Sequence, residues 1–284
     1  MIKTGLIIKN ISNNYLVQVD NLTYNCIPRG KLRYLKVIPC VGDHVSIDTE
    51  NKIILEILPR KNNLERPNVS NIDLAIIMTS LKEPNLSLNL LDKELLVVEQ
   101  NKIKPIIVYS KLDLLNEKEK EDFKKIFNYY QELGYPSLYN TEINKLKHLL
   151  SNKIVVITGQ TGSGKSSLIN HLNPSLELKT SPISKSLGRG IHTTRNTELY
   201  SIDDFYIVDT PGFSSLNINN LKEDEVKNYY PDFKKYKCDF KDCNHLKNCA
   251  VTNAIKSDTI LESRYNSYLQ FYKECYESSR KLFK

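Results

Sequence analysis

The order of three short motifs constrains the fold of this chain more than any other feature. A glycine-rich loop begins at Gly159 and ends with Lys165 and Ser166, between an apolar run at 154–158 and helical spacing at 166–172. An Asp-x-x-Gly element starts at Asp209, 44 residues beyond Lys165. A Lys-x-Asp segment at 111–113 precedes both, although in ordinary guanine-reading P-loop domains it follows them. This order predicts a circularly permuted P-loop domain.

The glycine-rich loop is typical of a site that binds phosphate groups. Its glycines let successive backbone N–H groups face the phosphates, and the following helix adds the positive end of its dipole. Lys165 would reach the terminal phosphates, and the Ser166 hydroxyl would bind Mg²⁺. The alternative, a chance match in a turn, is disfavoured by the strand and helix around the loop. The predicted phosphate-binding residues are Gly159, Gln160, Thr161, Gly162, Ser163, Gly164, Lys165, Ser166 and Ser167.

The Asp-x-x-Gly element is expected to contact the terminal phosphate and its metal ion. Asp209 ends a β run and is placed to hold Mg²⁺ through water, while the backbone N–H of Gly212 meets the γ-phosphate. A polar segment at 188–195 has two glycine hinges and suits a switch loop that closes on Mg²⁺. Either Thr193 or Thr194 in that loop could supply the hydroxyl ligand.

Hydrolysis requires a group that orients the attacking water, and many GTPases place a Gln just after the Asp-x-x-Gly element. Here Phe213 occupies that position. His192, in the predicted switch loop, is therefore the candidate catalytic residue. The alternative is an exposed loop histidine without a catalytic role.

Guanine recognition is assigned to the segment after the apolar run at 106–109. The Asp113 carboxylate would accept hydrogen bonds from N1 and N2 of guanine, and the Lys111 stem would cover the ring. Ser110 stands where the motif usually begins with Asn or Thr, so that a hydroxyl replaces the amide that braces the phosphate loop. A serine-alanine backbone element is expected before a helix at 144–150, but Asn140-Thr141 stands there. The predicted base-binding residues are Ser110, Lys111, Leu112 and Asp113.

Residues 5–58 have the texture of a small barrel. Five short β-rich runs, at 6–8, 15–19, 23–27, 44–47 and 53–58, are separated by Asn, Gly and Pro. An OB-type barrel would present a face to oligonucleotides, whereas an SH3-like barrel with a structural role is the alternative. Residues 1–66 hold ten Lys and Arg against six Asp and Glu, but a solvated surface would explain this excess equally well. The candidate nucleic-acid-binding residues are Arg29, Lys31, Arg33, Tyr34 and Lys36.

The texture changes to alternating α/β after residue 73, and cysteines gather near the C-terminus. Apolar runs at 74–78 and 106–109, with helical spacing at 90–100 and 116–133, predict a parallel sheet. Cys238-x4-Cys243-x-His245-x3-Cys249 matches a closed structural zinc site with no position for a catalytic water, whereas three unrelated thiols are the alternative. Helical spacing at 260–283 indicates a core stripe. The other three cysteines are scattered, which favours a reducing compartment.

This combination of barrel, permuted domain and Cys-Cys-His-Cys segment resembles the bacterial ribosome small-subunit-dependent GTPase A family over essentially the whole chain. The resemblance implies GTP hydrolysis stimulated by the small ribosomal subunit, a role late in its maturation, 16S rRNA contacts through the barrel and zinc domain, and catalysis by His192. Ser110, the missing serine-alanine element and a short interval from His245 to Cys249 depart from the family pattern. The matching stretches include Pro28-Arg29-Gly30-Lys31-Leu32-Arg33, Val41-Gly42-Asp43, Arg66-Pro67, Asn71-Ile72-Asp73, residues 159–170, residues 188–195, Cys249-Ala250-Val251 and Arg264-Tyr265.

The sequence therefore predicts a multidomain protein with three parts. Residues 1–66 form an OB-type rRNA-binding barrel, residues 67–220 a circularly permuted α/β P-loop GTPase domain, and residues 221–284 a mostly helical zinc-binding domain. We expect a cytoplasmic monomer without a membrane segment, with one structural Zn²⁺, and with Mg²⁺ bound beside GTP or GDP. The alternative function is an rRNA-binding assembly factor that holds nucleotide but hydrolyses it slowly.

Overall fold

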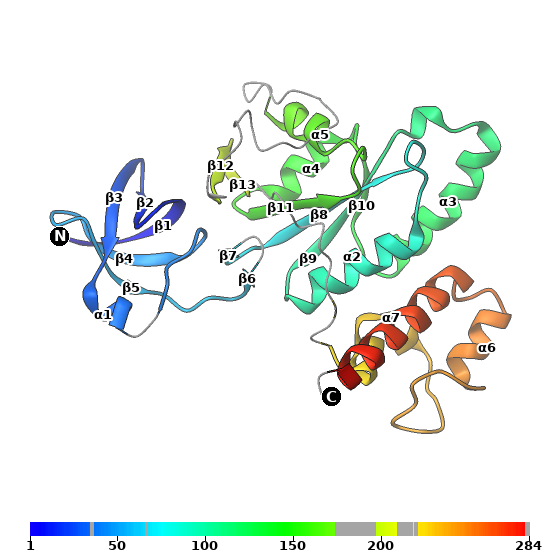
Figure 1. Cartoon of the computed structure of the whole chain (residues 1–284). Coiled ribbons are helices and arrows are strands. Elements are labelled where there is room, and N and C mark those ends of the chain that lie inside the picture. Colours follow the sequence, from blue (N-terminus) through cyan, green and yellow to red (C-terminus); the bar gives the residue numbers. More distant parts are fainter. Residues whose placement is uncertain (35–36, 66–67, 174–196, 209–217, 219–220, 282–284) are drawn as a thin grey trace.

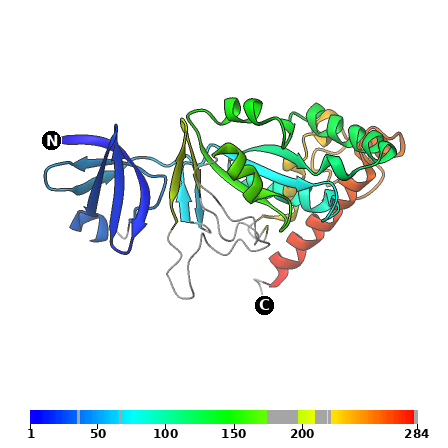
Figure 2. The same cartoon turned by 90° about the horizontal axis from the view of Figure 1, so that it is seen from above.

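The computed structural model describes residues 1–34, 37–65, 68–173, 197–208, 218 and 221–281. Three regions follow one another along the chain: a β-barrel, a sheet with helices on both faces, and a helical C-terminal region (Figure 1). The central sheet lies between the barrel and the C-terminal helix in both views (Figure 2). This arrangement confirms the predicted multidomain architecture.

The N-terminal region is a closed five-stranded barrel in the order β1-β2-β3-β5-β4, with β4 returning to pair with β1. Alternate side chains such as Val17, Val45 and Ile47 point into its core and are buried, which is the pattern of strands with one face turned inward. A short helix, α1 (Gly30–Tyr34), joins β3 to β4. The closed five-stranded order confirms the OB-type barrel over the SH3-like alternative. The barrel strands are β1 (Ile2–Ile11), β2 (Asn14–Val19), β3 (Leu22–Pro28), β4 (His44–Asp48) and β5 (Ile53–Ile57).

The central sheet has six strands in the order β10-β9-β8-β11-β13-β12. All neighbours pair in parallel except β12, which runs antiparallel to β13. The three strands that precede β11 in the sequence lie on one side of it, and the two that follow lie on the other. This order confirms the permutation. The strands are β8 (Leu74–Ser80), β9 (Lys104–Ser110), β10 (Ser137–Tyr139), β11 (Ile154–Gly159), β12 (Leu199–Ile202) and β13 (Phe205–Val208).

Two pairs of helices cover the sheet, because successive residues of its apolar strands point to opposite faces. Helices α2 (Leu88–Gln100) and α3 (Glu117–Glu132) pack on the face that contains Ala75 and Ile77. Helices α4 (Ile143–Leu150) and α5 (Lys165–Leu172) pack on the other face. Asn116 caps α3 through a capping box with Glu119.

A short hairpin of β6 (Asn63–Glu65) and β7 (Asn68–Ser70) lies where the predicted boundary between barrel and GTPase domain falls. Leu64 and Val69 of this hairpin belong to one continuous core that extends from the barrel into the sheet. The barrel also contacts the sheet directly. Lys9 of β1 forms an ion pair at 2.7 Å with Glu198, which immediately precedes β12, and the Tyr206 hydroxyl of β13 donates to Gln18 of β2 at 3.1 Å. The exact limits of the three domains remain a prediction.

The C-terminal region contains α6 (Ala250–Lys256) and α7 (Glu262–Lys281), preceded by the 3₁₀ helices Glu223–Tyr229 and Phe233–Lys235. Its core includes Leu96 and Val97 of α2, so this region packs directly on the GTPase domain. Helix α7 lies beside α2 (Figure 1). Among the described residues, no helix combines the length and apolar character that a membrane span requires.

A buried ion pair joins the two helices. Nη1 of Arg264 on α7 lies 2.5 Å from Oδ1 of Asp92 on α2, and neither side chain is more than 1 % exposed. The Tyr130 hydroxyl donates to the same Asp92 oxygen at 2.7 Å. The guanidinium also lies 4.3 Å from the centre of the Tyr230 ring, at cation–π distance. The ion pair between Arg264 and Asp92 links residues 172 positions apart in the sequence.

Candidate nucleotide site and metal centre

The predicted phosphate loop lies at the carboxyl ends of the parallel strands. Gly159 ends β11 opposite Met78 of β8, and Ser80 at the end of β8 lies opposite Ser110 at the end of β9. Strand β11 lies between β8, which precedes it in the sequence, and β13, which follows it. The chain connections therefore run in opposite directions on its two sides, which makes this position the switch point of the sheet. Ligands of open α/β sheets bind at such carboxyl edges. The fold therefore brings residues 110–113 and 159–167 to one edge, although about 50 residues separate them in the sequence.

The backbone of the loop requires glycine at three positions. Gly159, Gly162 and Gly164 have φ values of 137°, 82° and 93°, in the region that side chains disfavour. A Cβ at Gly159 would lie 2.2 Å from the Met78 carbonyl oxygen, so a larger residue there would displace β8. The sequence pattern is therefore explained by the close approach of the loop to the neighbouring strand.

Lys165 begins α5 directly after the loop. Its Nζ donates to the carbonyl oxygens of Gly159 and Gln160 at 2.6 and 2.8 Å, so the ammonium group lies inside the loop. Burial lowers the pKa of this amine, and the charge of nearby Glu94 opposes that shift. A cation at the centre of the loop and the N-terminus of α5 beside it together suit the binding of phosphate oxygens.

The predicted base-binding segment contacts the phosphate loop. The buried Ser110 hydroxyl donates to the Ser163 carbonyl oxygen at 2.7 Å, so this serine bridges the end of β9 to the loop. Lys111 has a left-handed backbone conformation with φ of 60°, and its Nζ donates to the Glu83 carbonyl oxygen. Asp113 lies exposed in the 3₁₀ turn Leu112–Leu114, where its carboxylate is free to meet a ligand.

The segment at Asn140 and Thr141 stands where a serine-alanine element was expected. The Asn140 backbone N–H donates to the Tyr109 carbonyl oxygen at 2.8 Å, which places this turn beside the end of β9.

Several predicted residues lie outside the part of the chain that the structure describes, and their roles remain predictions. These are His192, Thr193, Thr194, Asp209 and Gly212, together with Lys36 of the barrel.

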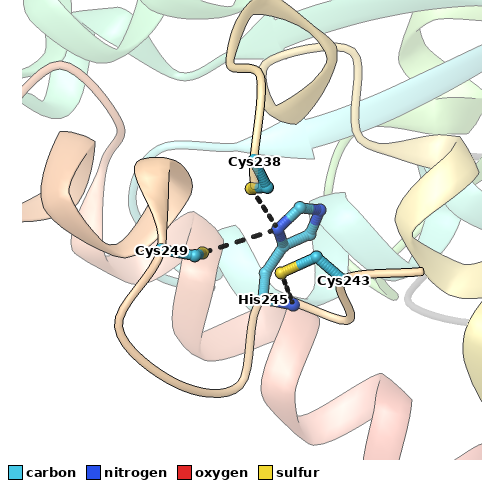
Figure 3. A group of neighbouring side chains, drawn as sticks. All are labelled: Cys238, Cys243, His245 and Cys249. Carbon is cyan, nitrogen blue, oxygen red and sulfur yellow. Dashed lines mark hydrogen bonds between the residues drawn. The ribbon is translucent and has the colours of Figure 1, made fainter. Parts of the chain in front are cut away.

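The Cys-Cys-His-Cys segment folds into a compact cluster of ligand atoms (Figure 3). The four atoms of Cys238, Cys243, His245 and Cys249 all lie within 4.8 Å of one another. Nδ1 of His245 lies 3.5 Å from the Cys238 sulfur and 3.7 Å from the Cys249 sulfur. Sulfur atoms bound to one tetrahedral Zn²⁺ are ~3.8 Å apart, given Zn–S bonds of ~2.3 Å. The donor set and its spacing therefore fit a zinc ion.

Residues around the cluster hold His245 in position. Its backbone has φ of 54°, and its carbonyl oxygen accepts a hydrogen bond from the Tyr265 hydroxyl at 2.6 Å. Lys227 donates to the Cys243 carbonyl oxygen at 3.1 Å. Burial and the charge of Lys227 lower the pKa of His245, which favours the neutral imidazole that binds metals. Burial acts to raise the pKa of the Cys249 thiol, but hydrogen bonds from Thr252 lower it on balance.

Two features of the site were not predicted from the sequence. One is an open groove of about 490 Å³ beside the metal cluster, whose polar lining includes four lysines. Phe240 stands at this groove and is 79 % exposed. The lysine-rich, aromatic composition of 227–241 was a usable signal, because cations with stacking rings are typical of single-stranded nucleic-acid sites. The lysines are Lys227, Lys234, Lys237 and Lys241. The second feature is Glu94, which lies buried behind the phosphate loop.

The barrel cations that were predicted to bind rRNA lie around α1. Arg29 and Lys31 are exposed at the end of β3 and the start of α1, and Tyr34 is 86 % exposed. The side chain of Arg33 lies outside the described part of the chain. An exposed ring beside two cations is an arrangement that favours stacking with a nucleobase.

Comparisons with known proteins give a consistent result. The family model described as RsgA GTPase matches residues 57–219, and the RsgA N-terminal domain matches residues 4–53. A small ribosomal subunit biogenesis GTPase RsgA from Limosilactobacillus fermentum is 42% identical over 283 residues, covering 95% of this chain and 96% of that protein. The protein of that name from Latilactobacillus sakei is 41% identical over 96% of each chain.

Two solved structures share the fold over nearly the full length. The crystal structure of YjeQ from Thermotoga maritima has a TM-score of 0.84 and 32% identity, covering 97% of this chain and 99% of that one. The structure of YloQ, described as a circularly permuted GTPase, has a TM-score of 0.83 and 31% identity, covering 98% and 96%. The permuted sheet, the phosphate loop and these relationships agree, and the chain belongs to the RsgA GTPase family.

Proposed function

We propose that this chain is a GTPase that binds the small ribosomal subunit and acts late in its biogenesis. The observation that carries the proposal is the contact between Ser110 and Ser163, which joins the upstream base-binding segment to the phosphate loop despite the permuted order. The near-full-length relationship to small ribosomal subunit biogenesis GTPases supports the same conclusion. In this role GTP orders the switch loops, the subunit accelerates hydrolysis, and the GDP-bound form leaves.

Nucleotide binding is assigned to the two segments at the carboxyl edge of the sheet. In this proposal Lys165 leaves the carbonyl oxygens of Gly159 and Gln160 and turns to the phosphates of GTP. The exposed Asp113 carboxylate accepts from the guanine base, and Lys111 covers its ring. Ser110 holds the phosphate loop at a fixed distance from the base-binding turn.

Hydrolysis is assigned to groups that meet at the γ-phosphate. Ser166 follows Lys165 at the start of α5, which suits its proposed role as a Mg²⁺ ligand. Asp209 and a threonine of the switch loop would complete the protein contacts to that ion, which neutralises the phosphate charge when bound. His192 would orient the attacking water, and this group acts mainly in the transition state.

The cysteine cluster is proposed to hold a structural zinc ion. Three thiolates and one imidazole fill a tetrahedral site and leave no position for a substrate water. The ion would order the loop at 238–249, which has little regular secondary structure of its own. The ion would then also shape the groove that Lys227, Lys237 and Lys241 line.

Two basic surfaces are proposed to contact 16S rRNA. One is formed by Arg29, Lys31 and Tyr34 on the barrel, and the other by the lysine groove beside the metal cluster. Phosphate neutralisation by such cations provides most nucleic-acid affinity, and exposed rings add stacking. The barrel and the C-terminal region, which carry these surfaces, lie on opposite sides of the central sheet (Figure 2), so a cytoplasmic monomer would bridge two parts of the rRNA.

A turnover assay tests the proposed function. Phosphate release is measured with GTP and with ATP, alone and with purified small ribosomal subunits, and large subunits serve as the matched control. We expect GTP hydrolysis to be preferred and to be accelerated by small subunits only. A rate that small subunits leave unchanged would contradict the timer model and favour the assembly factor that holds nucleotide without rapid hydrolysis.

A further inference from the structure

Glu94 is a buried carboxyl group directly behind the phosphate loop. It lies on α2, is 4 % exposed, and accepts a hydrogen bond from the Thr158 hydroxyl at 3.0 Å. Thr158 immediately precedes Gly159, the first residue of the loop. The other buried carboxylates in the described part of the chain, Asp43, Asp92 and Asp232, are each paired with an arginine. Among the described residues, Glu94 has no such ion pair, so its charge is balanced in a different way.

The charge that acts on Glu94 is that of Lys165. Burial raises the pKa of Glu94 to about 7, while the Thr158 hydroxyl and the Lys165 ammonium oppose this rise. Lys165 is in turn influenced by Glu94. Among the described residues, Lys165 is the charged group that shifts the pKa of Glu94. The buried carboxyl of Glu94 and the partly buried ammonium of Lys165 are therefore two opposite charges beside the same loop.

Helix α2 is held on its opposite side, so Glu94 has a fixed position. Residues two apart on a helix point about 200° apart, which places Asp92 away from Glu94. Asp92 is bound to Arg264 of α7, and neighbouring Lys93 pairs with Glu274 at 2.9 Å. These contacts anchor the helix to the C-terminal region. They therefore fix the backbone position from which the Glu94 side chain reaches Thr158.

Nucleotide binding places further negative charge against this carboxyl group. Phosphates that bind Lys165 take its ammonium as their partner, so an ionised Glu94 loses its balancing charge and faces an anion in a buried site. A neutral carboxylic acid avoids that repulsion and still forms a hydrogen bond with Thr158. The proton comes from the buffer, and none is transferred to or from the nucleotide.

We propose that Glu94 is a positioning residue of the phosphate loop, which holds Lys165 and Thr158 while the loop is empty and takes up a proton when nucleotide phosphates bind. The proposal rests on the nucleotide-binding function proposed above. In this proposal Glu94 acts through Lys165 and Thr158, without contacting the base or the phosphates itself.

Calorimetric titration with GDP from pH 6 to pH 8.5, in two buffers of different ionisation enthalpy, tests this proposal. Wild-type protein should take up a fraction of a proton per GDP bound near pH 7.5. Its affinity should fall with rising pH by ~threefold to tenfold more than that of Glu94→Gln, since a shift of one pKa unit corresponds to tenfold. Glu94→Gln keeps an acceptor for Thr158 and lacks the charge, so its affinity should exceed that of wild type at pH 8.5.

Two further variants separate positioning from a general effect on folding. Glu99→Gln removes another carboxylate of α2, which accepts a hydrogen bond from the Tyr135 hydroxyl and does not face the loop. This variant should retain the wild-type pH profile. Thr158→Val removes the hydrogen bond and keeps the carboxyl, so its profile should shift to higher pH. Identical profiles for wild type and Glu94→Gln, or equal proton uptake by both, would overturn the proposal. Failure of wild type to bind GDP at any pH would instead contradict the proposed function.

Discussion

Replacement of Arg264 should release the C-terminal region from α2. Arg264→Leu would leave Asp92 and Asp232 buried without their cation, because the guanidinium lies 2.5 Å from Asp92 and 3.5 Å from Asp232. Removing one partner of a buried ion pair costs about 3–5 kcal/mol. The variant also loses the cation–π contact with Tyr230. We expect the free energy that protects α7 amides to fall by that amount.

Hydrogen exchange measured by mass spectrometry reports this change region by region, which suits a chain without tryptophan. Exchange of α7 and α6 should accelerate, whereas that of barrel strand β1 should stay constant. The matched control is Lys93→Gln, which breaks a partly exposed pair with Glu274 in the same interface and should cost under ~1 kcal/mol. In the double variant Asp92→Asn with Arg264→Leu, the free energy that protects α7 amides should be at least ~1 kcal/mol higher than in Arg264→Leu alone. Equal effects of Arg264→Leu and Lys93→Gln would refute this reasoning.

Three other variants test separate parts of the site. His192→Ala should lower the subunit-stimulated rate and leave GTP affinity nearly unchanged; an equal loss of binding, measured by titration, would indicate a structural role. Ser110→Ala removes the hydrogen bond to Ser163 and should weaken GTP binding by about 1 kcal/mol, about fivefold; unchanged affinity would show that this contact does not brace the loop. Cys243→Ser should lose zinc by metal analysis and keep intrinsic GTP binding, but lose most subunit stimulation; wild-type stimulation without zinc would make the metal segment a bystander.

Local patterns in the sequence predicted most of the fold. Short apolar runs predicted the parallel strands, and helical spacing at 116–133 predicted α3. Strand β12 and the β6–β7 hairpin were missed, because their three or four residues carry too little periodicity to stand out. The permutation was predicted from motif order. The base-binding and phosphate-binding motifs must lie at neighbouring strand ends to hold one nucleotide, so their order along the chain indicates how the strands are connected.

Contacts between distant residues were not predicted. Asp92 and Glu94 are charged residues of the helix predicted at 90–100, yet both are buried, Asp92 against Arg264 and Glu94 against Thr158. Nothing near these residues in the sequence indicates partners 172 and 64 positions away. The zinc ligands could be predicted because Cys and His at short spacing are their own signal.

The central claim is that the upstream segment at 110–113 reads guanine in a permuted site. Asp113→Asn tests it directly, because an amide at this position donates to the oxygen at the 2-position of xanthine instead of accepting from guanine. Binding of GTP and of xanthosine triphosphate is measured for wild type, for Asp113→Asn and for the exposed control Asp122→Asn. Hydrogen bonds to a charged group contribute about 1.5–3 kcal/mol, so we expect GTP affinity to fall ~tenfold to hundredfold and xanthosine triphosphate to be preferred by Asp113→Asn alone. Unchanged GTP binding in Asp113→Asn would contradict the account.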